Sequence, residues 1–215
     1  MDINVFRAWI TSAAGVIEAN RDHLTQLDAA IGDADHGINL ARGFAAVLAA
    51  LDAKPAGTPG AVLILTGSTL ISKVGGASGP LYGTAFRRAG QSLGAAEDVG
   101  LPALAQALDA ALAGVQQLGA AREGDKTMVD ALAPATRALA KAVAEGATRD
   151  EALTATALAA AEGAAGTMSM EARKGRASYL GPRSVGHEDP GAASTVLILT
   201  ALRDAAARGD GAAAS

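Results

Sequence analysis

The sequence contains no cysteine, and this absence limits the chemistry that the chain can carry out. Disulfides, thiolate catalysis, iron–sulfur clusters and zinc sites built on cysteine are all excluded. Any metal ion must therefore be held by oxygen or imidazole ligands.

Aromatic residues and clusters of basic residues are also scarce. Phe, Trp and Tyr make up 3% of the chain, which leaves few surfaces on which nucleic-acid bases could stack. The formal net charge is −4, and Lys and Arg do not gather in one stretch. Because binding to a nucleic-acid backbone depends on concentrated positive charge, we expect no nucleic-acid partner.

Long uncharged apolar runs are missing as well. No segment reaches the roughly 18 consecutive apolar residues that a membrane span needs. The first residues, "MDINVFRAWI", lack the basic start, apolar stretch and cleavage site of a signal peptide. We therefore expect a cytoplasmic protein with no membrane association.

Alanine and leucine at helical spacing are abundant. Hydrophobic residues make up 50% of the 215 residues, which is enough for one large domain with a sizeable core. Apolar residues recur three and four positions apart between short Gly, Pro or Asp breaks, as at Leu104, Leu108 and Leu112. We predict an all-α fold, with a single domain over residues 1–208 and a disordered tail over 209–215.

Breaks in the pattern place the ends of the helices. At "EGATRDEAL", Gly146 can end one helix, and Thr148 with Glu151 forms a capping box that starts the next. "AVLILTGSTLI" and "STVLILTALR" have the β-branched content of buried strands, but no neighbouring segment offers an alternating partner, so we assign both to helices. The predicted helices span residues 4–26, 37–53, 60–74, 79–95, 101–119, 125–145, 149–169 and 191–208.

Four polar, glycine-containing loops interrupt the helices, and the first is "LDAAIGDADHGINLARGF". On an unbroken helix Asp28 and Asp35 would share a face, while Asp33 would point about 140° away. Glycines at 32 and 37 allow a turn that brings the three carboxylates around one point. Clustered carboxylates repel one another unless a cation neutralises them, and hard divalent cations prefer such ligands.

If the cation is magnesium, its tendency to keep waters and recruit phosphate oxygens suggests a nucleotide as co-ligand. Gly37 to Asn39 would then open a helix N-terminus toward the phosphate. An acidic capping loop is the alternative. An EF-hand is excluded because, with Asp33 at position 1, Ile38 replaces the required glycine and Phe44 the required glutamate.

The second and third loops are "KVGGASGPLYG" and "GAAREGDKTMVDAL". The glycines of the second allow the backbone to approach an anion and Ser78 offers a hydroxyl, although a flexible turn explains the same residues. The third resembles a Walker A motif, but Asp125 precedes the lysine and no strand comes before it, so it is not a P-loop. Met128 there suits a helix core, with an adenine contact as the alternative.

The fourth loop, "RKGRASYLGPRSVGHEDPGAAST", is unusually long for a connection between helices, and long loops in compact domains are often functional. Its "HEDPG" is not the HExxH motif of zinc proteases. His187 there, and His23 in the first predicted helix, suit surface positions better than metal ligation.

Together these loops resemble the ADP-binding L subunits of bacterial dihydroxyacetone kinases. The resemblance covers almost the whole chain in order, through "LDAAIGDADHGINLARGF", "GGASGPLYG", "GDKTMVDAL", "GRASYLG" and "DPGAAST". It implies a closed barrel of eight antiparallel amphipathic helices, with the nucleotide site in loops at one end. Eight is also the number of helices predicted above.

The resemblance implies a role for individual residues. Asp28, Asp33 and Asp35 would be the ligands of two magnesium ions and, with Arg176, would form the catalytic set. Some relatives carry a hydroxyl residue at the position of Ala77. Alanine has no hydroxyl, so here only the backbone could contribute. The residues implied to bind ADP or ATP are His36, Gly37, Ile38, Asn39, Ala77, Ser78, Gly119, Met128, Arg176, Asp189, Pro190 and Gly191.

The implied reaction is transfer of a phosphoryl group from the nucleotide to dihydroxyacetone, which a separate K subunit holds through a hemiaminal to its own histidine. Since no sugar-binding half is evident, we expect a free-standing subunit that is active only with this partner. Arg173, Lys174 and Arg183 are expected to help form the docking surface. A phosphocarrier protein of the phosphotransferase system is a further possible partner, which would recharge bound ADP.

Two alternatives remain open at this stage. The same nucleotide barrel would serve an enzyme with another acceptor, such as a tetrulose or a protein-bound acyl group. It would also serve a nucleotide-loaded regulator of a transcription factor.

Overall fold

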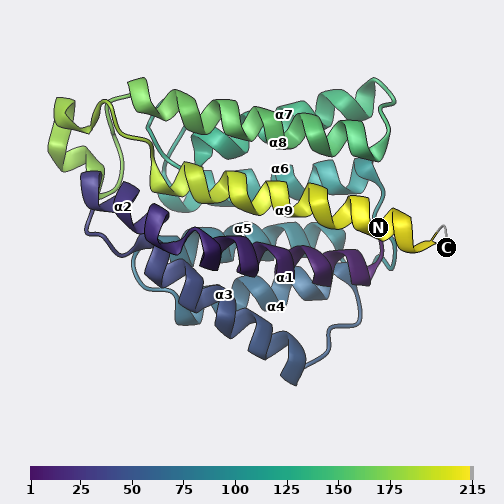
Figure 1. Cartoon of the computed structure of the whole chain (residues 1–215). Helices are drawn as coiled ribbons and strands as arrows, with labels where there is room; N and C mark the ends of the chain where they lie inside the picture. The colour runs from purple at the N-terminus through teal and green to yellow at the C-terminus, as the bar shows by residue number, and fades with distance from the viewer. Residues whose placement is uncertain (214–215) are drawn as a thin grey trace.

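The computed structural model describes residues 1–213, and within that range the chain is built from helices and loops without a β-strand (Figure 1). The all-α prediction is therefore confirmed, including helices at both β-branched segments. The α-helices are α1 (Ile3–Ala19), α2 (Arg21–Ile31), α3 (His36–Ala53), α4 (Pro59–Lys73), α5 (Ser78–Leu93), α6 (Leu101–Gly119), α7 (Val129–Ala144), α8 (Arg149–Gly166) and α9 (Pro190–Ala213). Two 3-10 segments, η1 (Thr167–Ser169) and η2 (Arg176–Ser184), lie between α8 and α9.

The first predicted helix is divided at Asn20, so that prediction was wrong about continuity. The side-chain amide of Asn20 donates to the carbonyl of Val16 at 2.8 Å. Asparagine commonly offers the backbone such alternatives to the helical pattern. The division produces the separate short helix α2, whose last turn carries Asp28.

Other segments also differ from the prediction, and α2 ends at Ile31 instead of at residue 26. Residues 125–128 precede α7 instead of belonging to it, because Gly124 and Lys126 have φ values of 88° and 61°, outside the helical region. The segment η2 was expected as loop. Helix α9 continues through residues 209–213 of the expected disordered tail, and residues 214 and 215 lie outside the described part.

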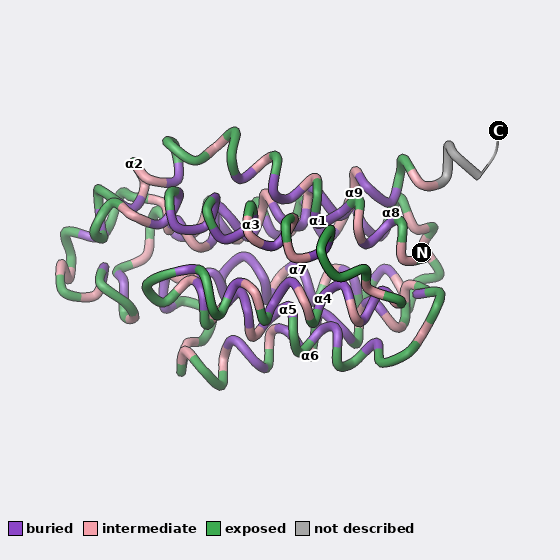
Figure 2. The backbone as a smooth tube through the Cα atoms, turned by 90° about the horizontal axis from the view of Figure 1, so that it is seen from below, coloured by how far each residue is buried: buried purple, intermediate pink, exposed green. Residues whose placement is uncertain are grey.

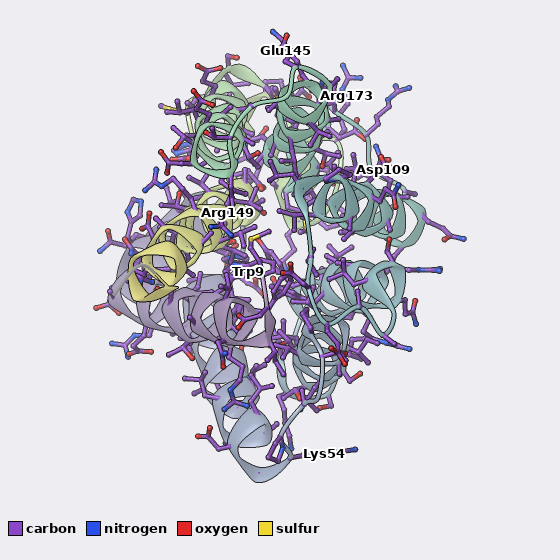
Figure 3. The ribbon with its side chains drawn as sticks, turned by 90° about the vertical axis from the view of Figure 1, so that its right-hand side faces the viewer. Trp9, Lys54, Asp109, Glu145, Arg149 and Arg173 are labelled. Atoms are coloured by element: carbon purple, nitrogen blue, oxygen red, sulfur yellow. The ribbon has the colours of Figure 1, made fainter. Side chains whose placement is uncertain are left out.

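Eight long helices pack in a closed order. Each of α1, α3, α4, α5, α6, α7, α8 and α9 contacts the next, and α9 contacts α1. Neighbouring helices run antiparallel (Figure 1). Gly43 in the first half of α3 lies against Val74, which follows the end of α4. Gly163 near the end of α8 lies against Asp130 in the first turn of α7. Helix α2 stands beside this ring and packs on α3. Figure 3 views the ring from the end where the two chain termini lie.

The interior of the ring is apolar. Buried positions alternate with exposed ones along the helices, and the buried positions lie mostly toward the middle of the molecule (Figure 2). Trp9 on α1 lies within the ring (Figure 3), contacts the rings of Phe6 and Phe86, and donates from its indole N–H to the carbonyl of Ile198 at 2.8 Å. It thereby joins α1, α5 and α9. No helix in residues 1–213 is long and apolar enough for a membrane span.

The two ends of the ring differ in character. The chain termini lie at one end, and the loops α2–α3 and α8–α9 lie at the other (Figure 1). The packed helices thus provide a rigid support for the loops at the end away from the termini.

Candidate functional site

The four polar loops meet around one cavity of about 300 Å³, at the lower end of the volumes typical of small-molecule sites. Its walls come from the ends of α2, α5, α6 and α9 and from the loops between helices. The predicted site residues that line it are Asp28, Asp33, Asp35, His36, Ala77, Ser78, Gly119, Met128, Arg176, Asp189, Pro190 and Gly191.

Three predicted residues do not line this cavity. Gly37 is buried against α2, where a Cβ atom would stand 2.0 Å from the Arg21 carbonyl, so the glycine permits close packing of α2 and α3. Ile38 is exposed on the outside of α3. Asn39 is buried, and its side-chain oxygen accepts from Arg42 at 2.8 Å.

The turn between α2 and α3 brings the three aspartates together. One oxygen from each of Asp28, Asp33 and Asp35 lies within 4.8 Å of the others. The Asp28 carboxylate accepts from the backbone N–H groups of Asp35 at 2.8 Å and His36 at 3.1 Å. Asp28 therefore fixes the turn and satisfies an otherwise unpaired N–H at the start of α3.

Gly32 leaves room for the Asp28 carboxylate. A Cβ atom at Gly32 would lie 2.0 Å from a carboxylate oxygen of Asp28, so a side chain there would displace this carboxylate from its bonds to Asp35 and His36. Ala34 follows with a φ of 62°, an uncommon conformation for a residue with a side chain. The backbone is thus bent so that Asp33 and Asp35 face the same space as Asp28.

This acidic cluster has the donor set that magnesium prefers. All three ligands are carboxylate oxygens, and Asp33 and Asp35 keep partial or full exposure, so water and phosphate oxygens could complete the coordination. Helix α3 begins at the cluster, and its N-terminal N–H groups favour nearby negative charge. The residues present therefore fit a divalent cation bound together with an anion.

Arg176 reaches the cluster from the long loop. Its guanidinium lies 3.0 Å from a carboxylate oxygen of Asp33, and its side chain is largely exposed. An exposed pair of this kind contributes little to stability. It does show that the η2 segment can place a positive charge over the acidic side of the cavity.

His36 connects two walls of the cavity. Its Nδ1 lies 2.9 Å from the Ser78 hydroxyl on α5, and its Nε2 lies 2.9 Å from the Ser194 hydroxyl on α9. Burial lowers the pKa of His36, and the negative charges of Asp28 and Asp35 only partly oppose this. His36 is therefore neutral near pH 7 and holds Ser78 in place rather than supplying a positive charge.

Tyr82 continues this network into the interior. Its hydroxyl contacts the hydroxyls of Ser194 at 2.6 Å and Thr195 at 2.9 Å, and donates to the carbonyl of Gly191 at 2.8 Å. Burial raises the pKa of Tyr82, so the phenol stays protonated. The first turn of α9 is thereby fixed to α5.

Part of the cavity wall is apolar. Met128 is buried there and lies against Gly191, where a Cβ atom would stand 3.4 Å from that of Met128. Gly119, the last residue of α6, also lines the cavity. Apolar groups of this kind can contact the flat face of a planar ring.

Asp189 is the most perturbed acid of the site. Its carboxylate accepts from the N–H of Ala192 at 2.7 Å and caps α9. Burial raises the pKa of Asp189 to about 7, although this hydrogen bond and the charge of Lys126 lower it. Asp189 can therefore change protonation state near neutral pH.

The sequence did not assign Tyr82, Lys126 or Ser194 to the site, and all three are buried. Tyr82 and Lys126 line the cavity, and Ser194 contacts His36 and Tyr82. A buried hydroxyl or ammonium group needs partners, so a polar residue on the apolar stripe of a helix is the signal that would have indicated Tyr82 and Ser194. Lys126 gave no such signal, because its partners come from distant residues.

The fold and the site define an all-helical domain that presents an acidic cluster and a cavity in the loops at one end. Residues 30–204 match the family model described as the DAK2 domain, and the chain belongs to this family. Over 198 residues it is 43% identical to the ADP-binding subunit DhaL of the PEP-dependent dihydroxyacetone kinase of Escherichia coli, covering 92% of this chain and 94% of that protein. It is also 40% identical to the L-erythrulose 1-kinase of Mycolicibacterium smegmatis, covering 85% of this chain and 32% of that protein.

A solved structure supports the same assignment. The dihydroxyacetone kinase of C. freundii in complex with AMP-PNP and Mg²⁺ matches with a TM-score of 0.67 and 29% identity, over 91% of this chain. The match covers 33% of the C. freundii chain, so this chain spans about one third of that kinase.

Proposed function

We propose that this chain is the nucleotide- and magnesium-binding subunit of a dihydroxyacetone kinase, active together with a separate K subunit that holds the sugar. The observation that carries the proposal is the placement of Asp28, Asp33 and Asp35 within 4.8 Å of one another beside the cavity. The full-length similarity to an ADP-binding subunit of such a kinase supports it.

The proposed ligand positions follow from the walls of the cavity. Asp28, Asp33 and Asp35 would hold two magnesium ions, which would neutralise the charge of the phosphate groups during transfer. Ser78, oriented by His36, and the backbone at Ala77 would bind phosphate oxygens. The apolar wall at Gly119 and Met128 would bind adenine, and the turn Asp189 to Gly191 would close against the nucleotide.

Arg176 is the proposed catalytic residue besides the three aspartates. Its guanidinium already reaches Asp33, so it can approach a phosphate group bound at the same cluster. A fixed positive charge stabilises the negative charge that spreads over the oxygens of a transferring phosphoryl group. Positioning and charge neutralisation of this kind require no general base from this chain.

The sugar acceptor would come from the partner. The proposed nucleotide and metal sites use most of the polar groups of the cavity, whereas phosphoryl transfer needs the acceptor oxygen in line with the terminal phosphate. Arg173, Lys174 and Arg183 lie in the long loop at the same end and supply positive charge for docking. The PEP dependence in the name of the E. coli relative supports a phosphocarrier protein as the source of the phosphoryl group.

A coupled assay of dihydroxyacetone phosphorylation tests this function. We expect no turnover by the purified chain alone, and turnover when its K-type partner is added, with either ATP or phosphoenolpyruvate plus the general phosphocarrier proteins as donor. The donor that supports turnover identifies how the nucleotide is recharged. Robust turnover of free dihydroxyacetone by this chain without a partner would contradict the split site.

A tetrulose is the second candidate acceptor, because the chain is similar to an L-erythrulose 1-kinase. The acceptor site would again lie on a different polypeptide or domain. Substituting L-erythrulose for dihydroxyacetone in the same assay decides between the two sugars.

A further inference from the structure

Lys126 is a buried lysine that the proposed ligand set does not use. Its exposed fraction is 1%, and its backbone has a φ of 61°. The ammonium group donates to the carbonyl of Thr167 at 2.5 Å and also to the carbonyl of His187. Both acceptors belong to segments more than forty residues away from Lys126 in the sequence.

These two carbonyls lie at the two ends of the long loop, residues 167–189. The same ends are joined by the N–H of Asp189, which donates to the Thr167 hydroxyl at 3.0 Å, and by the N–H of Gly186, which donates to the carbonyl of Met168 at 2.7 Å. The ammonium group of Lys126 therefore bridges the neck of the loop, where the chain leaves α8 and returns to α9.

The neck determines where the loop places its functional groups. Arg176 extends from the loop to Asp33, and Asp189 follows the neck directly at the start of α9. Away from the neck, the loop is attached to the rest of the molecule by a bond from the N–H of Arg173 to the carbonyl of Asp125 and by a small apolar cluster around Ile31. A change at the neck would thus displace both Arg176 and Asp189, which line the cavity.

Lysine is an unfavourable residue at this position except for its carbonyl contacts. Its left-handed backbone conformation is costly for a residue with a side chain, and burial of an ammonium group opposes the charged form. Burial accordingly lowers the pKa of Lys126, while the charges of Asp189, Asp130 and Glu188 raise it. The two charge-assisted hydrogen bonds are the interactions that can offset these costs.

We propose that Lys126 is a positioning residue that closes the neck of the 167–189 loop and so holds Arg176 and Asp189 at the nucleotide cavity. The structural part of this inference stands on the contacts of Lys126. Its effect on the nucleotide rests on the proposed function.

Amide hydrogen exchange without nucleotide tests the structural part. Lys126→Met keeps the length and apolar stem of the side chain but removes the ammonium donor from both carbonyls. We expect exchange in residues 170–186 to rise by about tenfold or more, with α4 and α5 unchanged, because a charged hydrogen bond contributes strongly to local stability. Lys126→Arg, which keeps a charged donor, should restore most of the protection, and Lys141→Met on the exposed face of α7 is the matched control.

If Lys126→Met does not fold, Lys126→Gln is the second variant, because it retains an uncharged donor and should show a smaller rise in the same residues. Unchanged exchange of residues 170–186 in a folded Met or Gln variant would overturn the proposal. A rise spread evenly over all helices would also overturn it, since that result assigns Lys126 to general stability.

A double-mutant cycle on ADP affinity in the presence of magnesium tests the positioning role. Lys126→Met and Arg176→Ala should each weaken binding, and Lys126→Met should cost less affinity once Arg176 is absent, because part of its effect acts through Arg176. Fully additive losses would contradict that link. If the wild-type chain binds no ADP, the proposed function fails, and hydrogen exchange alone then decides the role of Lys126.

Discussion

Asp189 links the acidity of the cavity to the stability of the fold. Its pKa is raised from 3.8 to about 7 in the folded chain, chiefly by burial. The folded state therefore binds a proton more readily than the unfolded state between these two values. The resulting stabilisation is fully present below the unfolded value and is lost as the pH rises through about 7.

We predict a pH-dependent difference between the wild-type chain and Asp189→Asn. Asparagine keeps an oxygen that can accept from Ala192 but cannot ionise. Without nucleotide, the free energy of unfolding of the wild type should fall relative to the variant by on the order of 2 kcal/mol between about pH 5 and pH 8. Denaturant melts of both proteins across this range measure the difference, and parallel pH profiles would show that Asp189 does not titrate as described. His36 is common to both proteins, so its own titration cancels.

The sequence was informative about single residues whose role depends on their neighbours in the chain. Asp28, Asp33 and Asp35 lie close together in the sequence, and the neighbouring glycines indicated a turn that could bring their carboxylates together. Residues whose role depends on distant partners were not accessible in this way. Lys126 bonds to Thr167 and His187, and no pattern near position 126 specifies those contacts.

Among the helices, the pair α4 and α5 shows how glycine permits close packing. A Cβ atom at Gly67 would stand 2.4 Å from the carbonyl oxygen of Gly83 and 2.8 Å from the backbone nitrogen of Arg87. Gly60 and Gly90 make equally close approaches further along the same pair. These backbone atoms cannot move aside without separating the helices.

Gly67→Ala should therefore destabilise the fold by about 1–3 kcal/mol, because overpacking at a rigid interface outweighs the better helix propensity of alanine. Gly15→Ala on α1 is the control, since a Cβ atom there has no neighbour within 4 Å. The control should leave stability unchanged or raise it by up to about 1 kcal/mol. Thermal melts compare the two, and equal effects would remove the packing argument.

Helix boundaries were predictable where a local signal ends the helix. The capping box at Thr148 and Glu151 is present as expected, with α8 starting at Arg149. The break at Asn20 was missed because the apolar stripe continues through it. The start of α7 was misplaced because the positive φ of Lys126 has no signature in the sequence.

At the scale of the whole molecule, the cavity end is where a partner must dock for transfer to occur. Arg183→Ala in the exposed part of η2 should reduce turnover of the mixed kinase by about tenfold while changing ADP affinity far less, because a charge pair across an interface acts on association. Lys54→Ala, after α3 and away from the cavity end, is the control and should change neither. Equal losses of turnover and ADP affinity would reassign Arg183 to nucleotide binding.

The closed order of the helices explains why the site can be built from loops distant in sequence. Each helix pair returns the chain to the same end, so residues near positions 30, 77, 126 and 176 meet there. The all-α class and the approximate helix positions followed from periodicity. The convergence of the four loops did not, because it depends on how the ring closes, and only the resemblance to a known family indicated it.

The central claim is that the acidic cluster binds nucleotide through magnesium, and calorimetric titration of ADP with and without magnesium tests it most directly. We predict magnesium-dependent binding by the wild-type chain and no measurable binding by Asp33→Asn or Asp35→Asn, since each change removes one ligand and its charge. Both variants should melt no lower than the wild type in the absence of metal, because a repulsion is relieved. Asp109→Asn, on the exposed face of α6, should bind as the wild type does. Unchanged ADP affinity in both cluster variants would contradict the account.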